Sequence, residues 1–210
     1  KNPSYIMSAR IKPFPCVGTG QCAVEAAIQL NRKLNGDLSG VRQLRLEMGD
    51  HPTVIRHLAD AERANPTSRE AADHSIPFLI AVAALDGELG MRQFSNDRWN
   101  DPRVRDLMAK IVTHTDEVLR HKSPENFACR IEAFTDAGSC SSEVLAPPGW
   151  SREGIVKGAV LSKFHRITLD ALPEATRGNI VQAALNLADA KDVTQLAALL
   201  ATQVLDVKSS

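Results

Sequence analysis

The residue types that could do chemistry gather in two stretches of the sequence, and the first surrounds Lys12. This lysine opens a loop that Pro13 and Pro15 restrict, and the loop runs through Gly18-Thr19-Gly20 into a segment with helical spacing. A lysine ammonium beside the N–H groups of a helix start forms a two-part cradle for a carboxylate. The alternative is a solvated surface lysine, and the spacing alone favours that alternative.

The second stretch, Ser68–Gly87, centres on an apolar helix around which we expect the chain to be organised. Ser75 is the expected N-cap, Pro77 falls in the first turn, and Gly87 stands where a helix end favours a positive φ. A helix this apolar must be buried on nearly every side. The positive end of its dipole lies at its N-terminus, which suits an anionic ligand.

Asp73 and His74 directly precede this helix. An imidazole beside a carboxylate can act as a general acid or base. The alternative is that Asp73 caps the helix and His74 is a half-buried structural residue. Arg69, a few residues earlier, is a candidate for a forked hydrogen bond to a carboxylate, although an arginine in such a polar run can simply face water.

Outside these stretches, the sequence shows no pattern typical of a metal or nucleotide site. The other histidines lack zinc-ligand spacing (His51, His57, His114, His121 and His165). A P-loop, a GxSxG motif and a GxGxxG motif after a strand are absent. We therefore expect no metal and no cofactor. The four cysteines are expected to be small buried hydrophobic residues, with Cys16 as the exception because its loop could line a site.

The composition is that of an ordinary globular protein. The 210 residues include 25 Lys plus Arg and 25 Asp plus Glu, so the net charge is zero and neither nucleic acid nor an anionic membrane is indicated as a partner. No apolar run reaches the roughly 20 residues of a membrane span, and the amino end lacks the apolar core of a signal peptide. We expect a cytoplasmic protein, or one of the mitochondrial matrix in a eukaryote. Because Lys1 is not a methionine, we expect a piece of a longer polypeptide or a processed product.

The hydrophobic pattern predicts helices and half-buried strands that interleave up to Pro148. Strands are expected over Tyr5–Ile11, Val41–Met48, Phe127–Ala133 and Ser142–Leu145, and helices over Gln21–Asn35, Asp50–Leu58, Asp101–Ile111 and the apolar stretch between Ser75 and Gly87. Strands with one wet face favour an α+β fold, a two-layer sandwich of a mostly antiparallel sheet with helices, over a doubly wound parallel sheet.

Pro147-Pro148-Gly149 is the best candidate for a domain boundary. It divides the chain into an α+β domain over residues 1–148 and a C-terminal helical segment over residues 149–210. Helical spacing recurs in Ile155–Leu172, Thr176–Ala188 and Val193–Val204, and no strand is expected there. Three helices are too few for a comfortable independent bundle, so we expect them to complete a helical domain whose remainder lies outside this chain.

Two stretches resemble the C-terminal half of the MmgE/PrpD family, namely Lys12–Ala27 (KPFPCVGTGQCAVEAA) and Arg69–Gly87 (REAADHSIPFLIAVAALDG). Further family-like segments are Asp101–Ile111, the strand pair near Phe127–Val144, Pro147-Pro148-Gly149 and Lys163-Phe164. The family includes 2-methylcitrate dehydratase, cis-aconitate decarboxylase and iminodisuccinate epimerase. The resemblance implies a metal-free enzyme, commonly a homodimer, whose active site lies between a large helical domain and a smaller α+β lid. This chain would supply the lid and the closing helices, and the missing N-terminal helical domain would hold most catalytic groups.

The resemblance also implies roles for individual residues. Lys12 matches a loop lysine that faces the substrate, Asp73 and His74 match an Asp-His pair at a helix start, and Phe78 stands where relatives often place an aromatic residue. Thr19 is a departure, because dehydratase relatives tend to have a histidine at about that position.

The reaction that we expect from the resemblance is elimination of water from a 2-hydroxy di- or tricarboxylate, such as 2-methylcitrate in propionate catabolism. A base would remove the proton next to a carboxylate while an acid protonates the leaving hydroxyl. The catalytic candidates are Lys12, Asp73 and His74, and the substrate-binding candidates are Arg69, Thr19 and Phe78. The alternatives are decarboxylation or epimerisation within the same family, or a non-catalytic binding or assembly domain.

Overall fold

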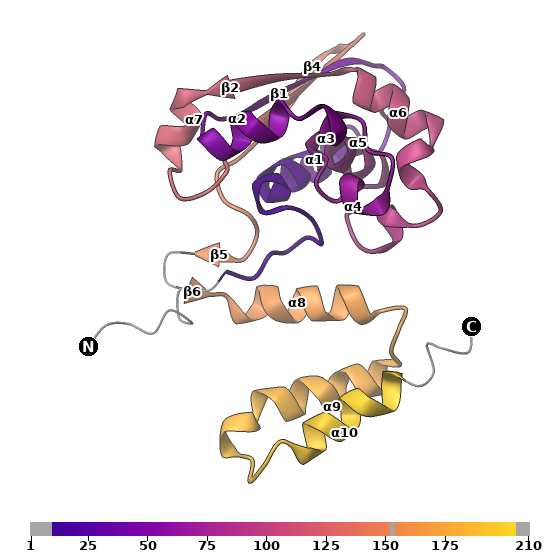
Figure 1. The fold of residues 1–210 in the computed structure, drawn as a ribbon, viewed down its shortest axis with the longest axis vertical. Coiled ribbons are helices and arrows are strands. Elements are labelled where there is room, and N and C mark those ends of the chain that lie inside the picture. The colour runs from indigo at the N-terminus through magenta and orange to yellow at the C-terminus, as the bar shows by residue number, and fades with distance from the viewer. Residues whose placement is uncertain (1–9, 152–153, 205–210) are drawn as a thin grey trace. The chain divides into compact units, whose positions relative to one another are not determined.

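The computed structural model describes residues 10–151 and 154–204 of the chain (Figure 1). Its residues fall into two compact units, Lys1–Val156 and Lys157–Ser210. The strand expected over Tyr5–Ile11 lies outside the described residues, apart from Arg10 and Ile11, which belong to no strand. No helix among the described residues is both long enough and apolar enough to cross a membrane.

The first unit contains a four-stranded sheet with strand order β2-β1-β3-β4. Strand β1 pairs in parallel with β2 and antiparallel with β3, and β3 pairs antiparallel with β4. The strands are β1 (Val41–Gly49), β2 (Ile111–Asp116), β3 (Cys129–Thr135) and β4 (Gly138–Val144). The helices are α1 (Gln21–Lys33), α2 (Pro52–Leu58), α3 (Ala61–Ala64), α4 (Arg69–Ala72), α5 (Ile76–Asp86), α6 (Pro102–Ala109) and α7 (Glu117–Lys122), with 3-10 turns η2 (Gly18–Gly20), η3 (Arg92–Phe94) and η4 (Arg98–Asn100). The predicted α+β fold, with a mostly antiparallel sheet, is confirmed.

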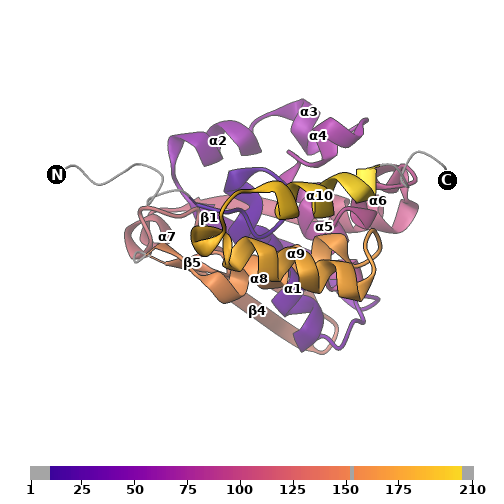
Figure 2. The same cartoon turned by 90° about the horizontal axis from the view of Figure 1, so that it is seen from below.

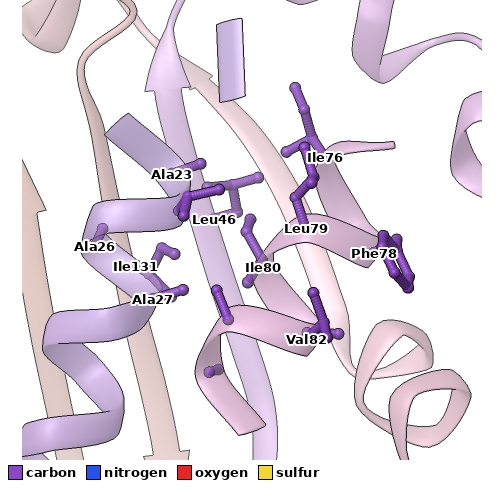
Figure 3. Packing of buried hydrophobic residues seen from close by; sticks show 14 of the residues in the cluster. Ala23, Ala26, Ala27, Leu46, Ile76, Phe78, Leu79, Ile80, Val82 and Ile131 are labelled. Carbon is purple, nitrogen blue, oxygen red and sulfur yellow. The ribbon is translucent and has the colours of Figure 1, made fainter. Parts of the chain in front are cut away.

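One face of the sheet is apolar and carries the helices. Leu44, Leu46 and Met48 of β1 are fully buried, as the alternation of this strand predicts. Helix α1 packs against β3 and β4, and α5 packs against α1. Figure 3 shows Ala23, Ala26 and Ala27 of α1 gathered with Leu46, Ile131 and the side chains of α5 in one core. The small alanine side chains allow the two helices to approach closely.

The opposite face of the sheet carries charged side chains that pair across neighbouring strands. The pairs between strands join Arg45 to Glu132, and Arg130 to Glu47 at 2.9 Å and to Glu143 at 2.6 Å. Lys122, at the end of α7, also pairs with Glu143 at 2.9 Å. Hydrogen bonds from Lys122 and Arg130 lower the pKa of the Glu143 carboxyl below its ordinary value. The polar face that the strand pattern predicts therefore carries a network of ion pairs.

Helix α5 has the boundaries and the burial that its sequence predicts. The Ser75 hydroxyl accepts a hydrogen bond from Phe78 N–H at 3.3 Å, so Ser75 is the N-cap. Gly87 ends the helix with φ of 72°, a left-handed conformation that glycine adopts without a Cβ clash. A Cβ at this position would lie 2.8 Å from Asn31 Oδ1. Both ends of the central helix are thus specified locally.

Strand β2 was not expected from the sequence. The helical pattern suggested one helix over Asp101–Ile111, but α6 ends at Ala109 and Ile111 instead begins β2. The chain passes from helix to strand at Lys110, which is bonded to β1 through both its backbone and its side chain. Its carbonyl accepts a hydrogen bond from Leu44 N–H at 2.9 Å, and its ammonium donates one to Val41 O at 2.8 Å. A second difference is a short pairing of β5 (Trp150–Ser151) with β6 (Gly154–Ile155), in a region where no strand was expected.

Over residues 157–204, the second unit contains three helices and a 3-10 turn. They are α8 (Lys157–Thr168), α9 (Glu174–Leu185), η5 (Leu187–Asp189) and α10 (Thr194–Val204), which agree with the predicted helices to within a few residues. Helices α9 and α10 lie side by side in both views (Figures 1 and 2). Several apolar side chains here are largely exposed, among them Leu169, Val193 and Leu200. The expectation that these helices complete a larger helical domain stays a prediction.

Candidate active site

The loop that carries Lys12 is organised by one buried amide, that of Gln21. Gln21 begins α1 and is fully buried. Its Oε1 accepts from Phe14 N–H at 3.0 Å, while its Nε2 lies 3.2 Å from Phe14 O, 3.1 Å from Cys16 O and 3.2 Å from Val17 O. Because the side chain bonds to three residues of the loop at once, the loop is fixed to the start of α1.

Lys12 and Asp73 are brought together by this loop. The Lys12 ammonium donates to Cys16 O at 2.9 Å, and Val17 N–H donates to the Asp73 carbonyl at 2.9 Å. The second bond ties the lysine loop to the junction between α4 and α5. The starts of α1 and α5 are also in contact, since a Cβ placed on Gly20 would lie 3.0 Å from Leu79 Cδ1. Two stretches far apart in the sequence therefore meet at one place.

Asp73 and His74 form the acid–imidazole pair that their adjacency suggested. His74 Nδ1 contacts Asp73 Oδ1 and also lies 3.2 Å from the Glu70 carbonyl. The side chain of His74 is 50% exposed and that of Asp73 is 33% exposed. Asp73 does not cap α5, because Ser75 does. The carboxylate is therefore free to orient the imidazole.

His57 joins this cluster, although its sequence position gave no indication of it. Its Nδ1 lies 2.8 Å from the hydroxyl of Thr19, a residue only 3% exposed. Burial lowers the pKa of His57 below its ordinary value of 6.5, and the charges of Arg63, Arg56 and His74 lower it further, while Asp60 opposes them. Because 38 residues separate Thr19 from His57, only the tertiary structure could bring them together.

The side chains of two predicted substrate-binding residues make none of the contacts described above. Arg69, in α4, is exposed and has no ion pair within residues 10–151 and 154–204. Phe78 is fully buried and packs against Phe94, with ring centroids 5.8 Å apart. Figure 3 shows Phe78 on the side of α5 away from α1. Substrate contact by Phe78 stays a prediction.

Cys16, the cysteine singled out for its loop, is buried and carries no disulfide. Burial raises the pKa of its thiol to about 12, although Lys12 acts in the opposite direction. A thiol with this pKa is protonated at neutral pH and is a poor nucleophile. Cys16 therefore contributes packing and a carbonyl oxygen to the loop.

Two surface hollows with described linings lie elsewhere in the first unit. One, of about 690 Å³, is lined by residues of η3 and η4 and includes Asp86 and Arg98. The other, of about 250 Å³, includes Arg10 and Trp150. Neither is lined by the predicted site residues. Within the described part of the chain, no three His, Cys, Asp or Glu side chains are grouped as metal ligands.

Fold and geometry define the class of protein: an α+β domain with ammonium, carboxylate and imidazole groups at the starts of two packed helices. A family model described as the MmgE/PrpD C-terminal domain matches residues 14–187, and the chain belongs to the MmgE/PrpD family. The matched range contains Thr19, His57, Asp73 and His74 and begins just after Lys12. The resemblance seen in the sequence is confirmed.

A curated protein with related sequence is the alkylcitrate dehydratase phiI of Talaromyces stipitatus. It is 27% identical to the chain over 183 residues. The alignment covers 81% of this chain and 38% of the relative. The chain therefore spans well under half of the relative's length.

Proposed function

We propose that this chain is part of a carbon–oxygen lyase that removes water from a 2-hydroxy di- or tricarboxylate. Membership of the MmgE/PrpD family supports the proposal, as does the similarity to a protein named as an alkylcitrate dehydratase. 2-Methylcitrate is the specific substrate that we propose, which would place the enzyme in propionate catabolism. The observation that carries the proposal is the hydrogen bond from Val17 N–H to Asp73 O, because it joins the lysine loop to the acid–imidazole pair.

The proposed reaction is a β-elimination. A base takes the proton from the carbon next to a carboxylate, the C–H electron pair becomes the new C=C bond, and the hydroxyl leaves with a proton from an acid as water. The Lys12 ammonium, held by the Cys16 carbonyl, would stabilise the negative charge that develops on the carboxylate. The Asp73–His74 pair would exchange one of the two protons. Arg69, exposed in α4, would hold a second carboxylate.

The rest of the site belongs, in this proposal, to parts outside the chain. Lys12, Asp73 and His74 would form the lid side of a cleft, and a helical domain N-terminal to the chain would close it. The exposed apolar side chains of α8, α9 and α10 support the idea that these helices pack on further helical structure. We propose no metal or cofactor, a homodimer, and a cytoplasmic or mitochondrial-matrix location.

The test compares Lys12→Ala with a matched control, Lys191→Ala, in the complete polypeptide. Lys191 is exposed in the second unit. The proteins are incubated with 2-methylcitrate and related acids, and the absorbance of the unsaturated product is followed. Loss of Lys12 is expected to lower kcat by about 10²–10³-fold, as for a lost oxyanion donor, while the control keeps full activity. Unchanged turnover in Lys12→Ala would remove Lys12 from the mechanism.

The same assay separates the alternatives. Release of carbon dioxide from cis-aconitate would identify a decarboxylase, and a change of configuration without an unsaturated product would identify an epimerase. Decarboxylation and epimerisation remain alternatives because this chain has Thr19 where dehydratase relatives tend to have a histidine. If the wild-type protein turns over none of the acids but binds them, the domain is a binding module.

A further inference from the structure

Resting on the proposed function, we propose that His57, anchored by Thr19, is the base that removes the proton next to the substrate carboxylate. The residue belongs to α2, and the charge of His74 acts on it. The proposal starts from a contact between a buried hydroxyl and a partly exposed imidazole.

Thr19 offers a fixed anchor for the imidazole ring. It lies in η2, between the lysine loop and α1, and it is almost fully buried. The following residue, Gly20, packs closely on α5, because a Cβ added there would lie 3.0 Å from Leu79 Cδ1. Helix α2 is held in turn by Val54, which is fully buried. Both partners of the hydrogen bond therefore lie on packed structure.

The chemistry of this hydrogen bond suits a group that gains and loses protons. A threonine hydroxyl can donate or accept. When Nε2 of His57 carries no proton, Nδ1–H donates a hydrogen bond to the Thr19 hydroxyl. When the proton is on Nε2 instead, the hydroxyl rotates and donates a hydrogen bond to Nδ1. The ring can thus change its protonation at Nε2 without losing its anchor, and Nε2 is the atom left to meet a substrate.

Burial and the charges around His57 favour its neutral imidazole. Burial is the largest cause of the lowered pKa, the charges of Arg63, Arg56 and His74 act in the same direction, and Asp60 opposes them. A neutral imidazole can accept a proton, whereas an imidazolium cannot. The cations that disfavour protonation also favour a polyanionic ligand nearby.

The site of His57 is continuous with the site already described. Thr19 lies two residues after Val17, whose N–H is bonded to Asp73 O, and the charge of His74 acts on His57. In the proposed step, His57 Nε2 takes the carbon-bound proton and becomes imidazolium. The C–H electron pair forms the double bond, and the hydroxyl leaves as water with a proton that His74 donates. Exchange with solvent then returns both imidazoles to their starting states.

The test uses His57→Gln, with His114→Gln as the control because His114 is exposed on β2. In the complete polypeptide, His57→Gln is expected to lower kcat by about 10²–10⁴-fold, and exchange of the substrate proton with D₂O should fall with it. The pH profile of wild-type kcat/KM should have an acidic limb below pH 6.5, and this limb should vanish in His57→Gln. His114→Gln should match the wild type in every measurement.

Two further variants separate the proposed role from a role in folding. Thr19→Ser keeps a hydroxyl and should retain most activity, whereas Thr19→Val should lose most of it while the tryptophan fluorescence of the folded state is unchanged. Wild-type activity that persists in His57→Gln with the acidic limb intact would overturn this assignment and leave the proposed function standing. A wild-type protein that turns over none of the acids would overturn both.

Discussion

Replacing Gln21 by leucine tests how the lysine loop is held in place. Leucine has a similar volume, so the change removes the amide without leaving a large cavity. The change removes Oε1, which accepts the hydrogen bond from Phe14 N–H. It also removes Nε2, which donates to the carbonyls of Phe14, Cys16 and Val17. The loop should therefore loosen while α1 itself remains helical.

The expected cost follows from the number of buried bonds that are lost. Gln21 is fully buried, and its amide supplies one acceptor oxygen and two N–H hydrogens to the loop. A buried polar group that loses its partner costs about 1–3 kcal/mol. Because several groups are affected and the loop can relax toward solvent, we expect the free energy of unfolding to fall by about 2–4 kcal/mol.

Urea unfolding followed by tryptophan fluorescence measures this change in the first unit. Both tryptophans of the chain, Trp99 and Trp150, belong to residues 1–156. With a denaturant slope of about 2 kcal/mol per molar, the midpoint should fall by roughly 1–2 M. Gln43→Leu is the control, since Gln43 is exposed on β1 and its replacement should change stability by less than about 0.5 kcal/mol.

Hydrogen exchange provides the second readout. The amides of Phe14 and Val17 should exchange faster in Gln21→Leu than in the wild type, because both are bonded through the loop. If the midpoint moves no more than in Gln43→Leu and these amides keep their protection, the loop is held by something other than Gln21. The account of how Lys12 is positioned would then be wrong.

Two further substitutions and one labelling experiment test the fold and the cysteines. Gly87→Ala should destabilise by about 1–3 kcal/mol in thermal unfolding, because φ is positive there and the new Cβ meets Asn31, whereas Gly40→Ala has open space and should be nearly neutral. The depressed pKa of Glu143 means that its ionised form stabilises the folded state; Glu143→Gln should therefore be less stable than the wild type above about pH 5, and the gap should close as the pH falls below about 4. A wild-type advantage that persists in acid would contradict this. In thiol labelling at pH 8, Cys140 should react first, because it is partly exposed and burial raises the pKa of the other thiols; equal rates would refute this.

The elements that could be predicted from the sequence are those whose signals are local. Helix α5 has an N-cap, a proline in its first turn and a C-terminal glycine, and strand β1 alternates strictly at Leu44, Leu46 and Met48. Each signal is contained within about a dozen residues, so no knowledge of distant contacts is needed.

Strand β2 is the strand of this sheet that the sequence did not predict. It follows α6 with only Lys110 between them, and most of its residues are exposed. It therefore offers neither a turn signal nor an apolar alternation. Its place is set by pairing with β1, a partner that lies more than sixty residues earlier in the chain.

The candidate site divides in the same way. The helix starts drew attention to Lys12, Asp73 and His74, and the structure brings these residues close through a backbone hydrogen bond that no spacing could indicate. The sequence does not single out His57, because its partner, Thr19, is 38 residues away. Residue type alone does not tell which side of a helix an aromatic ring occupies. The sequence therefore did not predict that Phe78 is fully buried.

The ion pairs on the open face of the sheet also select how the strands align. In the observed alignment, Arg45 stands opposite Glu132 and Glu47 opposite Arg130. A slip of one residue would turn the apolar side chains to solvent, so the smallest slip that keeps the core intact is two residues. That slip would set Arg45 opposite Arg130 in one direction and Glu47 opposite Glu132 in the other, and like charges repel when they face each other across strands. The charges therefore raise the free energy of the misaligned strand pairings that the hydrophobic pattern alone would allow.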